Sequence, residues 1–298
     1  MKMNRISFLS QNKIGLVLRA FATKREQIPD RAAIVGEMLT RALGTVVNEK
    51  FLIGRVDVMV WADNKNYPGK VDCGGLAEEL QQLRPKDCEY FVHEVHHGDL
   101  FCALSNYAVA IQSAAGCSYS LMISSEAAAY WTPSTMEAIV DAACAGAKAV
   151  GVAINELTQS VLEGRLANTF CLWRNRDLLT VGGFDLRAAN PIDDRRALYL
   201  HGWSQEKGEV FYPLQGVEEV IPLARLTELF GHCIAPILPS GSGVQQYRVP
   251  DPHAEPELWS RHVSKMGTKL ERQTALLASI GKDISFLRGG VMPQYRKF

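Results

Sequence analysis

The chain has 298 residues, and its 32 basic side chains balance its 32 acidic ones, so the formal net charge is zero. Hydrophobic residues make up 47% and charged residues 21% of the chain, which excludes collagen-like, disordered and disulfide-scaffold proteins. The balanced charge also argues against nucleic-acid binding, since proteins of that kind usually carry an excess of Lys and Arg.

The chain contains seven cysteines, an odd number, and no Cys-x-x-Cys pair. This pattern disfavours a zinc ribbon and a secreted disulfide framework, and it predicts buried thiols in a reducing compartment. Neither a secretory signal nor a transmembrane helix is expected. The longest stretch without Asp, Glu, Lys, Arg or His, Leu100–Ser125, is divided by Gly116 and interrupted by Ser, Asn and Gln. We therefore expect a cytoplasmic protein.

Short apolar runs alternate with amphipathic ones along the first half of the chain. Five runs are short and mostly β-branched or aromatic, as buried strands are: Ile14–Leu18, Val56–Trp61, Tyr90–Val95, Tyr119–Ile123 and Ala149–Ile154. Capping and stop residues predict helices between them, from Asp30 to Gly44, from Asp99 to Gly116, and from Thr132-Pro133 to Gly146. The alternation predicts an α/β fold with a mostly parallel central sheet and helices on both faces. In such folds ligands bind beyond the carboxyl ends of the strands.

The second half is less regular. Strands are predicted over Asn168–Trp173 and Cys233–Leu238, a helix over Glu218–Phe230, and a long loop or insertion over the site at Leu186–Pro213. The Pro- and Gly-containing segment 239–243 predicts a boundary between a domain of residues 1–240 and a C-terminal extension of residues 241–298.

Within that extension, apolar residues between Trp259 and Leu287 recur at alternating steps of four and three. This spacing predicts one long amphipathic helix with a single apolar seam. The seam packs either against its own domain or against a second copy of the chain in a homodimer.

Five motifs follow one another between Ile14 and Leu238, and their order is informative. They are Val58–Asp63, a strand ending in an acid; Gly98, Ala103 and Asn106 on a helix leading into Tyr119–Ile123; Thr132-Pro133; Arg174-Asn175-Arg176 followed by Val181–Asp185; and Gly216–Glu219 heading a helix. In this order the motifs resemble the inverting glycosyltransferases of family 2, which have the A-type glycosyltransferase fold. The resemblance covers most of the chain.

The resemblance implies transfer of a hexose, with inversion, from a UDP- or GDP-sugar to a hydroxyl of a saccharide or lipid-linked acceptor. By position in the motifs, Asp63 would contact the nucleotide, and Gly182, Gly183 and Asp185 would line the acceptor side. Glu219 would be the general base that removes the acceptor proton, with Glu218 as second choice.

The chain departs from the family where an Asp-x-Asp motif would hold Mn or Mg on the diphosphate, because Ser124, Ser125 and Glu126 occupy those positions. Three interpretations stay open. Glu126 binds the divalent cation with help from a residue such as His232. Cationic side chains such as Arg19 or Lys65 replace the metal. Or the site is degenerate, and the protein binds a nucleotide or sugar without catalysis.

Each of these residues also has a purely structural interpretation. Asp63 precedes Asn64 and suits a turn, and Gly182-Gly183 suits a bare tight turn. Glu218 and Glu219 suit the N-terminus of a helix for electrostatic reasons alone. A further acidic pair, Asp193-Asp194, lies beside Arg195-Arg196 and is interpreted as a solvated charge run.

The segment His93-Glu94-Val95-His96-His97 matches the His-Glu-x-x-His pattern of zinc peptidases, which requires a helix. The strand-like Tyr90–Val92 before it and Gly98-Asp99 after it argue against a helix here. A strand end that opens onto the nucleotide site is the preferred interpretation, and a zinc metallopeptidase is the remote alternative.

Overall fold

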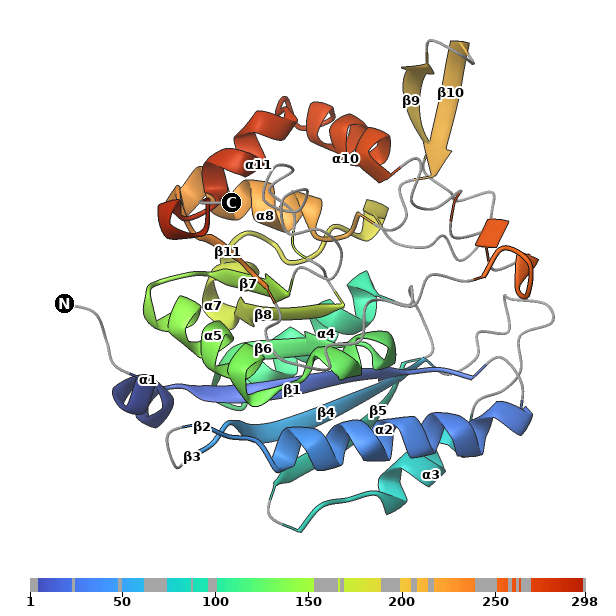
Figure 1. The fold of residues 1–298 in the computed structure, drawn as a ribbon, viewed down its shortest axis with the longest axis vertical. Coiled ribbons are helices and arrows are strands. Elements are labelled where there is room, and N and C mark those ends of the chain that lie inside the picture. Colours follow the sequence, from blue (N-terminus) through green and yellow to red (C-terminus); the bar gives the residue numbers. More distant parts are fainter. Residues whose placement is uncertain are drawn as a thin grey trace.

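The fold is built on a seven-stranded sheet with the strand order β11-β7-β8-β6-β1-β4-β5 (Figure 1). The structure is a computed structural model that describes residues 5–22, 25–47, 50–61, 74–86, 88–95, 101–152, 166, 169–188, 199–204, 208–213, 217–238, 251–256, 259–260, 263 and 269–296.

The five strands predicted in the first half are confirmed over the residues described. They are β1 (Lys13–Ala20), β4 (Ile53–Trp61), β5 (Glu89–Val95), β6 (Cys117–Ile123) and β7 (Ala149–Val152). The two strands predicted in the second half are β8 (Phe170–Arg174) and β11 (Ile234–Ile237). Two small antiparallel pairs accompany the sheet: β2 (Val46–Val47) with β3 (Lys50–Phe51), and β9 (Tyr199–Ser204) with β10 (Gly208–Pro213).

Most neighbouring strands are parallel, and β8 is the exception. It runs antiparallel to both β6 and β7, with Ile123 opposite Phe170 and Ala149 opposite Trp173. The mostly parallel sheet is therefore confirmed, and one reversed strand is inserted near its middle.

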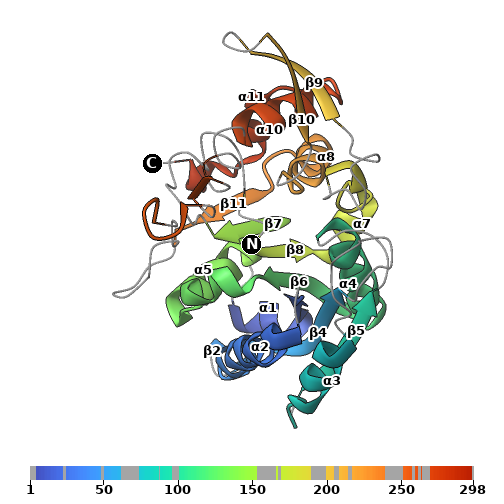
Figure 2. The ribbon, with the colours of Figure 1, turned by 90° about the vertical axis from the view of Figure 1, so that its right-hand side faces the viewer.

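Helices cover both faces of the sheet (Figure 2). One face carries α1 (Arg5–Gln11), α2 (Ile28–Leu43), α3 (Gly74–Gln82) and α5 (Pro133–Cys144). The other carries α4 (Cys102–Ala114), α7 (Asn175–Thr180) and α8 (Val220–Phe230), with α10 (Lys269–Ala278) and α11 (Ile284–Gly290) outside α8. Each face has its own apolar core, because successive strand residues point to opposite sides.

The helix ends follow the sequence with two differences. Thr132 caps α5 by accepting a hydrogen bond from the Thr135 N–H, and Pro133 occupies the first helical position, as predicted. Asp30 does not cap α2, which begins two residues earlier and places Asp30 in its first turn. Phe101 is the capping residue of α4, so the predicted cap Asp99, which lies outside the described residues, does not start that helix.

The single long C-terminal helix predicted from the apolar seam is wrong within residues 269–290. The chain breaks between α10 and α11, where Gly281 adopts φ +69° and Asp283 caps α11 through hydrogen bonds from Ser285 and Phe286. The Lys282 N–H bonds to the Leu277 carbonyl, which completes a glycine-terminated helix end. Both helices nevertheless bury Leu277 and Leu287 in the core shared with α8.

No helix in the described part of the chain has the length and apolar character needed to cross a bilayer. The domain boundary predicted near residue 240 lies outside the described residues, as do residues 189–198 and 205–207 of the predicted loop at Leu186–Pro213.

Candidate functional site

Four parallel strands end at one edge of the sheet, which we call the carboxyl edge. In the register of β1, Leu18 lies opposite Ile123 of β6 and Ala20 lies opposite Val60 of β4. Parallel sheets of this kind bind ligands at this edge. Arg19 lies there on β1, and its side chain is half-buried.

Helix α8 brings Glu218 and Glu219 to the same edge. The helix ends at Phe230, and β11 starts soon after it at Ile234, which lies opposite Ala149, the first residue of β7. The C-terminus of α8 is therefore at the amino edge of the sheet and its N-terminus at the carboxyl edge. Glu219 is the capping residue of α8, so both acids precede the helix at its positive end.

The two acids lie in a protected environment. Glu218 is 8% exposed and Glu219 0% exposed. Burial, followed by the charge of Glu219, raises the pKa of the Cys171 thiol on β8. Arg272 of α10 is itself buried, and its burial lowers its pKa while Glu218 and Glu219 act in the opposite direction. The acids therefore face a buried cation that comes from the C-terminal extension.

The Gly182–Phe184 turn is held by a side chain from α4. Gly182 and Gly183 have φ +87° and +71°, conformations that favour glycine. The Asn106 side-chain amide donates to the Phe184 carbonyl at 2.9 Å, and its oxygen accepts from the Phe184 N–H at 2.8 Å. A Cβ on Gly183 would lie 2.4 Å from the Asn106 Oδ1, so glycine is required there. Asp185 follows the turn and is half-buried.

Aromatic rings connect this turn to Arg19. The Arg19 guanidinium lies 4.4 Å from the centre of the Phe101 ring. Phe101 contacts Phe184 edge-on, and Phe184 contacts Trp173 in the same way, each pair with ring centres 5.1 Å apart. Packed aromatic rings therefore link Arg19 to the turn that contains Gly183.

The structure does not bring His232 to this site. His232 follows α8 at the amino edge of the sheet, and its Nδ1 contacts the Gly289 carbonyl and the Arg296 guanidinium. Because Glu126 comes soon after the carboxyl end of β6, the two are at opposite edges. The expectation that His232 helps Glu126 hold a metal is therefore wrong. The side chain of Glu126, and Asp63 and Lys65 entirely, lie outside the described residues.

The zinc-peptidase alternative lacks its helix. His93, Glu94 and Val95 are the last residues of strand β5, and within the described part of the chain no three His, Cys, Asp or Glu side chains gather as a metal site. His96 and His97 lie outside the described residues. His93 instead contacts a carboxylate in the core.

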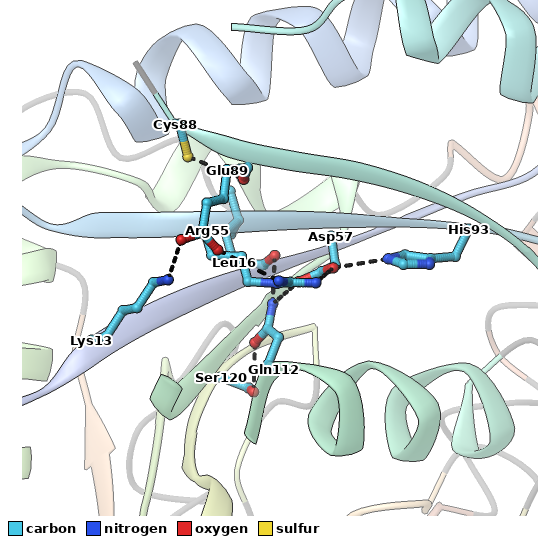
Figure 3. A network of polar contacts seen from close by, with 9 residues as sticks. All are labelled: Lys13, Leu16, Arg55, Asp57, Cys88, Glu89, His93, Gln112 and Ser120. Carbon is cyan, nitrogen blue, oxygen red and sulfur yellow. Dashed lines mark hydrogen bonds and ion pairs between the residues drawn. The ribbon is translucent and has the colours of Figure 1, made fainter. Parts of the chain in front are cut away.

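A buried polar network surrounds Asp57, a residue that the sequence analysis did not single out (Figure 3). Asp57 is 0% exposed and accepts two hydrogen bonds from Arg55 at 2.8 Å, one from Gln112 at 2.8 Å, and contacts the His93 Nε2 at 2.8 Å. Gln112 also donates to the Leu16 carbonyl and accepts from Ser120.

The network offsets the cost of burying this carboxylate. Burial alone would raise the pKa of Asp57, but hydrogen bonds from His93, Arg55 and Gln112 outweigh it, so the pKa is lowered. The signal in the sequence was the spacing: Arg55 and Asp57 alternate with valines and so share one face of β4. Since Asp57 lies mid-strand and is fully buried, we assign it a structural role.

Comparison with known proteins supports the fold. No family model and no curated protein sequence matches the chain. A mannosyltransferase from Pyrobaculum calidifontis, solved with GDP-Man and Mn2+, superposes with a TM-score of 0.56 at 12% identity, over 94% of this chain and 69% of its own. Glucosyl-3-phosphoglycerate synthase from Mycobacterium tuberculosis has a TM-score of 0.46 at 14% identity, covering 91% of this chain and 84% of its own.

A cytidylyltransferase from Leptospira borgpetersenii is also similar, with a TM-score of 0.44, 12% identity, and 94% and 99% of the two chains covered. At 12% identity, the likeness to the mannosyltransferase bears on the fold and leaves the reaction open. Together with the strand order, the mannosyltransferase superposition confirms the predicted A-type glycosyltransferase-like fold.

Proposed function

We propose that this chain, which has the fold of the nucleotide-sugar transferases, transfers a sugar from a nucleoside-diphosphate sugar to an acceptor hydroxyl. The observation that supports the proposal most directly is the position of the acidic pair Glu218-Glu219, which precedes α8 at the carboxyl edge, the edge at which β1 carries Arg19. Aromatic packing links Arg19 to the Gly182–Phe184 turn. A mannosyltransferase that superposes on this chain was solved with GDP-Man and Mn2+.

The chemistry assigns one role to each motif. As the acceptor oxygen forms its bond to the anomeric carbon, the bond from that carbon to the diphosphate breaks, and the nucleoside diphosphate leaves with the electron pair. A carboxylate takes the acceptor proton; Glu219 is proposed as this base and Glu218 as second choice. Arg19 supplies positive charge toward the diphosphate. Gly182, Gly183 and Asp185 line the acceptor side.

We propose a hexose as the transferred group and inversion as the stereochemical outcome, both from the family resemblance. The acceptor would be a saccharide or a lipid-linked hydroxyl. The anomeric configuration of the product, read from its proton NMR coupling constants, tests inversion: a product with the donor's own anomeric configuration contradicts it.

Dependence on Mn or Mg stays a prediction. Asp63 and the Glu126 side chain lie outside the described residues, and the described residues of the site supply no metal-ligand set that fits a cation. No step is therefore assigned to a metal. Calorimetric titration of GDP-mannose and UDP-glucose, each with and without Mn2+, measures whether binding requires the cation.

The base is tested by two carboxamide variants and a matched control. Glu219→Gln is expected to keep nucleotide-sugar binding and to lose transfer by at least about a hundredfold, since general bases contribute roughly that much. Glu228→Gln, at the other end of the same helix, is the control and should retain transfer. Loss of transfer in Glu218→Gln, with Glu219→Gln active, would move the role to Glu218.

The second candidate is a protein that binds a nucleotide or sugar without catalysis. It is favoured by the complete burial of Glu219 and by the Ser124-Ser125-Glu126 sequence in place of two aspartates. Binding that is unaffected by Mn2+, together with the absence of transfer and of donor hydrolysis, would support this candidate over the enzyme.

A further inference from the structure

The C-terminal extension contributes a buried cation to the neighbourhood of the acidic pair. Helix α10 packs on α8, as Figure 1 shows. Arg272 is 4% exposed, and Leu276, one turn further along the same face of α10, is fully buried in the core that contains α8. The face of α10 that carries Arg272 is thus fixed by packing.

A guanidinium in this position needs an opposite charge. Burial of a cation is costly unless it is paired, and the acids that act on Arg272 are Glu218 and Glu219. Two groups that titrate or carry charge interact with the pair: Arg272 from α10, with both acids, and the Cys171 thiol from β8, with Glu219. Arg272 is a cation that opposes the negative charge of the pair.

We propose that Arg272 is a positioning residue for Glu218 and Glu219, and that α10 thereby completes the catalytic site. This inference rests on the proposed function. Its guanidinium keeps the carboxylates ionised and oriented while they are shielded from water, so that one of them can accept a proton from the acceptor hydroxyl. It makes no contact with the reacting atoms in this role.

The first test is the pH dependence of transfer. A carboxylate that loses a neighbouring cation is protonated more readily. In Arg272→Met the acid limb of the kcat/KM profile is therefore expected to move up by about one pH unit, with about a tenfold loss on that limb and recovery toward alkaline pH. Arg272→Lys keeps the charge and should return the profile to nearly that of wild type. Nucleotide-sugar binding measured by calorimetry should stay within about threefold.

Lys282→Met is the matched control. Lys282 also lies in the C-terminal extension and also pairs with an acid of α8, Glu228 at 2.8 Å, but its partner is exposed and lies far along the helix from Glu219. This variant should keep the wild-type pH profile. A profile for Arg272→Met that is lowered equally at every pH, or that matches the control, would overturn the proposal.

A second measurement does not depend on transfer. Thermal unfolding of Arg272→Met, Glu219→Gln and the double variant forms a mutant cycle, and a second cycle uses Glu218→Gln. We expect the double variant to lose less stability than the sum of the single variants in at least one cycle, because each single change leaves a buried charge unpaired. Additive losses in both cycles would overturn the pairing.

The two measurements separate the inference from the function on which it rests. If the wild-type chain transfers no sugar from any donor tested while a cycle shows coupling, the proposed function fails and the catalytic role of Arg272 fails with it, although the ion cluster stands. If Arg272→Met does not fold, Arg272→Lys carries the pH test. A wild-type profile in that variant supports positioning by charge, and a profile lowered equally at every pH would overturn the proposal.

Discussion

Asn106 and Phe184 are joined by two hydrogen bonds across 78 residues of sequence, one accepted by the Asn106 oxygen and one donated by its amide nitrogen. The side chain thereby satisfies both backbone groups of the residue after Gly183. A surface turn with two glycines would otherwise have little to fix its shape. The bonds tie the turn to α4, which also carries Phe101 at its start, under the guanidinium of Arg19.

The first prediction concerns Gly183. Gly183→Ala places a methyl group 2.4 Å from the Asn106 Oδ1 and forces alanine to φ +71°. We expect a loss of about 3 kcal/mol in the free energy of unfolding. The left-handed backbone conformation contributes about 1–2 kcal/mol to this loss, and the broken hydrogen bonds contribute about 1–3 kcal/mol. Urea denaturation of the variant measures it.

Gly281→Ala is the matched control for that measurement. Gly281 also has a positive φ, +69°, but a Cβ there meets nothing within 4 Å. It should cost only the backbone contribution, about 1–2 kcal/mol. Equal losses in the two variants would show that the contact with Asn106 contributes nothing.

The second prediction concerns acid stability. The pKa of Asp57 in the folded protein is below its ordinary value, so its contribution to stability is present above the unfolded-state pKa near 4 and is lost as the pH falls through the folded value. Asp57→Asn leaves Arg55 without its bidentate partner in the core. It should lose about 3–5 kcal/mol at pH 7, and less at pH 3, because part of the wild-type advantage is gone there.

Guanidinium denaturation at the two pH values checks whether the stability difference between wild type and Asp57→Asn becomes smaller at pH 3. Glu137→Gln is the control, since Glu137 pairs with Arg5 at the surface and should change stability by less than about 1 kcal/mol at either pH. A gap between wild type and Asp57→Asn that is as wide at pH 3 as at pH 7 would contradict the role assigned to the Asp57 charge.

The sheet could be predicted from sequence to a large extent, because its strands are short apolar runs with one dominant periodicity. Ile14–Leu18 and Val56–Trp61 became β1 and β4 with small extensions. The direction of β8 could not be read, since a run such as Phe170–Trp173 looks the same in a parallel or an antiparallel strand. Topology fixes the direction, and periodicity does not encode it.

The candidate site was predictable only in part. The sequence named Glu219 and Gly183 from separate motifs; the fold brings Glu219 to the carboxyl edge and ties the turn that contains Gly183 to Asn106 of α4. The prediction that His232 helps to bind a metal was wrong. Residue type alone does not show which end of α8 lies at the carboxyl edge, and His232 follows the other end. Arg272 was missed because in sequence it is one more charge in an amphipathic helix, and only the packing of α10 buries it.

The third prediction concerns the contact between β1 and α4. A Cβ on Gly15 would lie 2.3 to 2.7 Å from three atoms of the Gln112 carboxamide. Gln112 cannot move aside without losing its bonds to Asp57, Leu16 and Ser120. Gly15→Ala should therefore destabilise the protein by about 1–3 kcal/mol, as overpacking of a core does. Melting temperatures compared with those of wild type measure the loss.

Two further variants make that result specific. In a Gln112→Ala background the added methyl group has room, so Gly15→Ala should cost clearly less there than in wild type. Gly289→Ala, in α11 with nothing within 4 Å of the new Cβ, should leave stability unchanged or raise it by up to about 1 kcal/mol. An unaltered cost of Gly15→Ala in the two backgrounds would be evidence against the contact.

The fourth prediction distinguishes the two roles left open for the C-terminal apolar seam. Leu277 is 0% exposed and lies in the core shared with α8, whereas Leu270, on the same helix, is 45% exposed. Leu277→Ala should cost about 2–5 kcal/mol in unfolding free energy at any protein concentration, and Leu270→Ala less than about 0.5 kcal/mol. If the seam instead served a homodimer, the cost of Leu277→Ala would shrink on dilution, because dissociation would already expose that side chain in wild type. Unfolding monitored over a hundredfold range of concentration therefore decides between them. A loss independent of concentration assigns Leu277 to the core of its own chain, and with it the packing of α10 that buries Arg272.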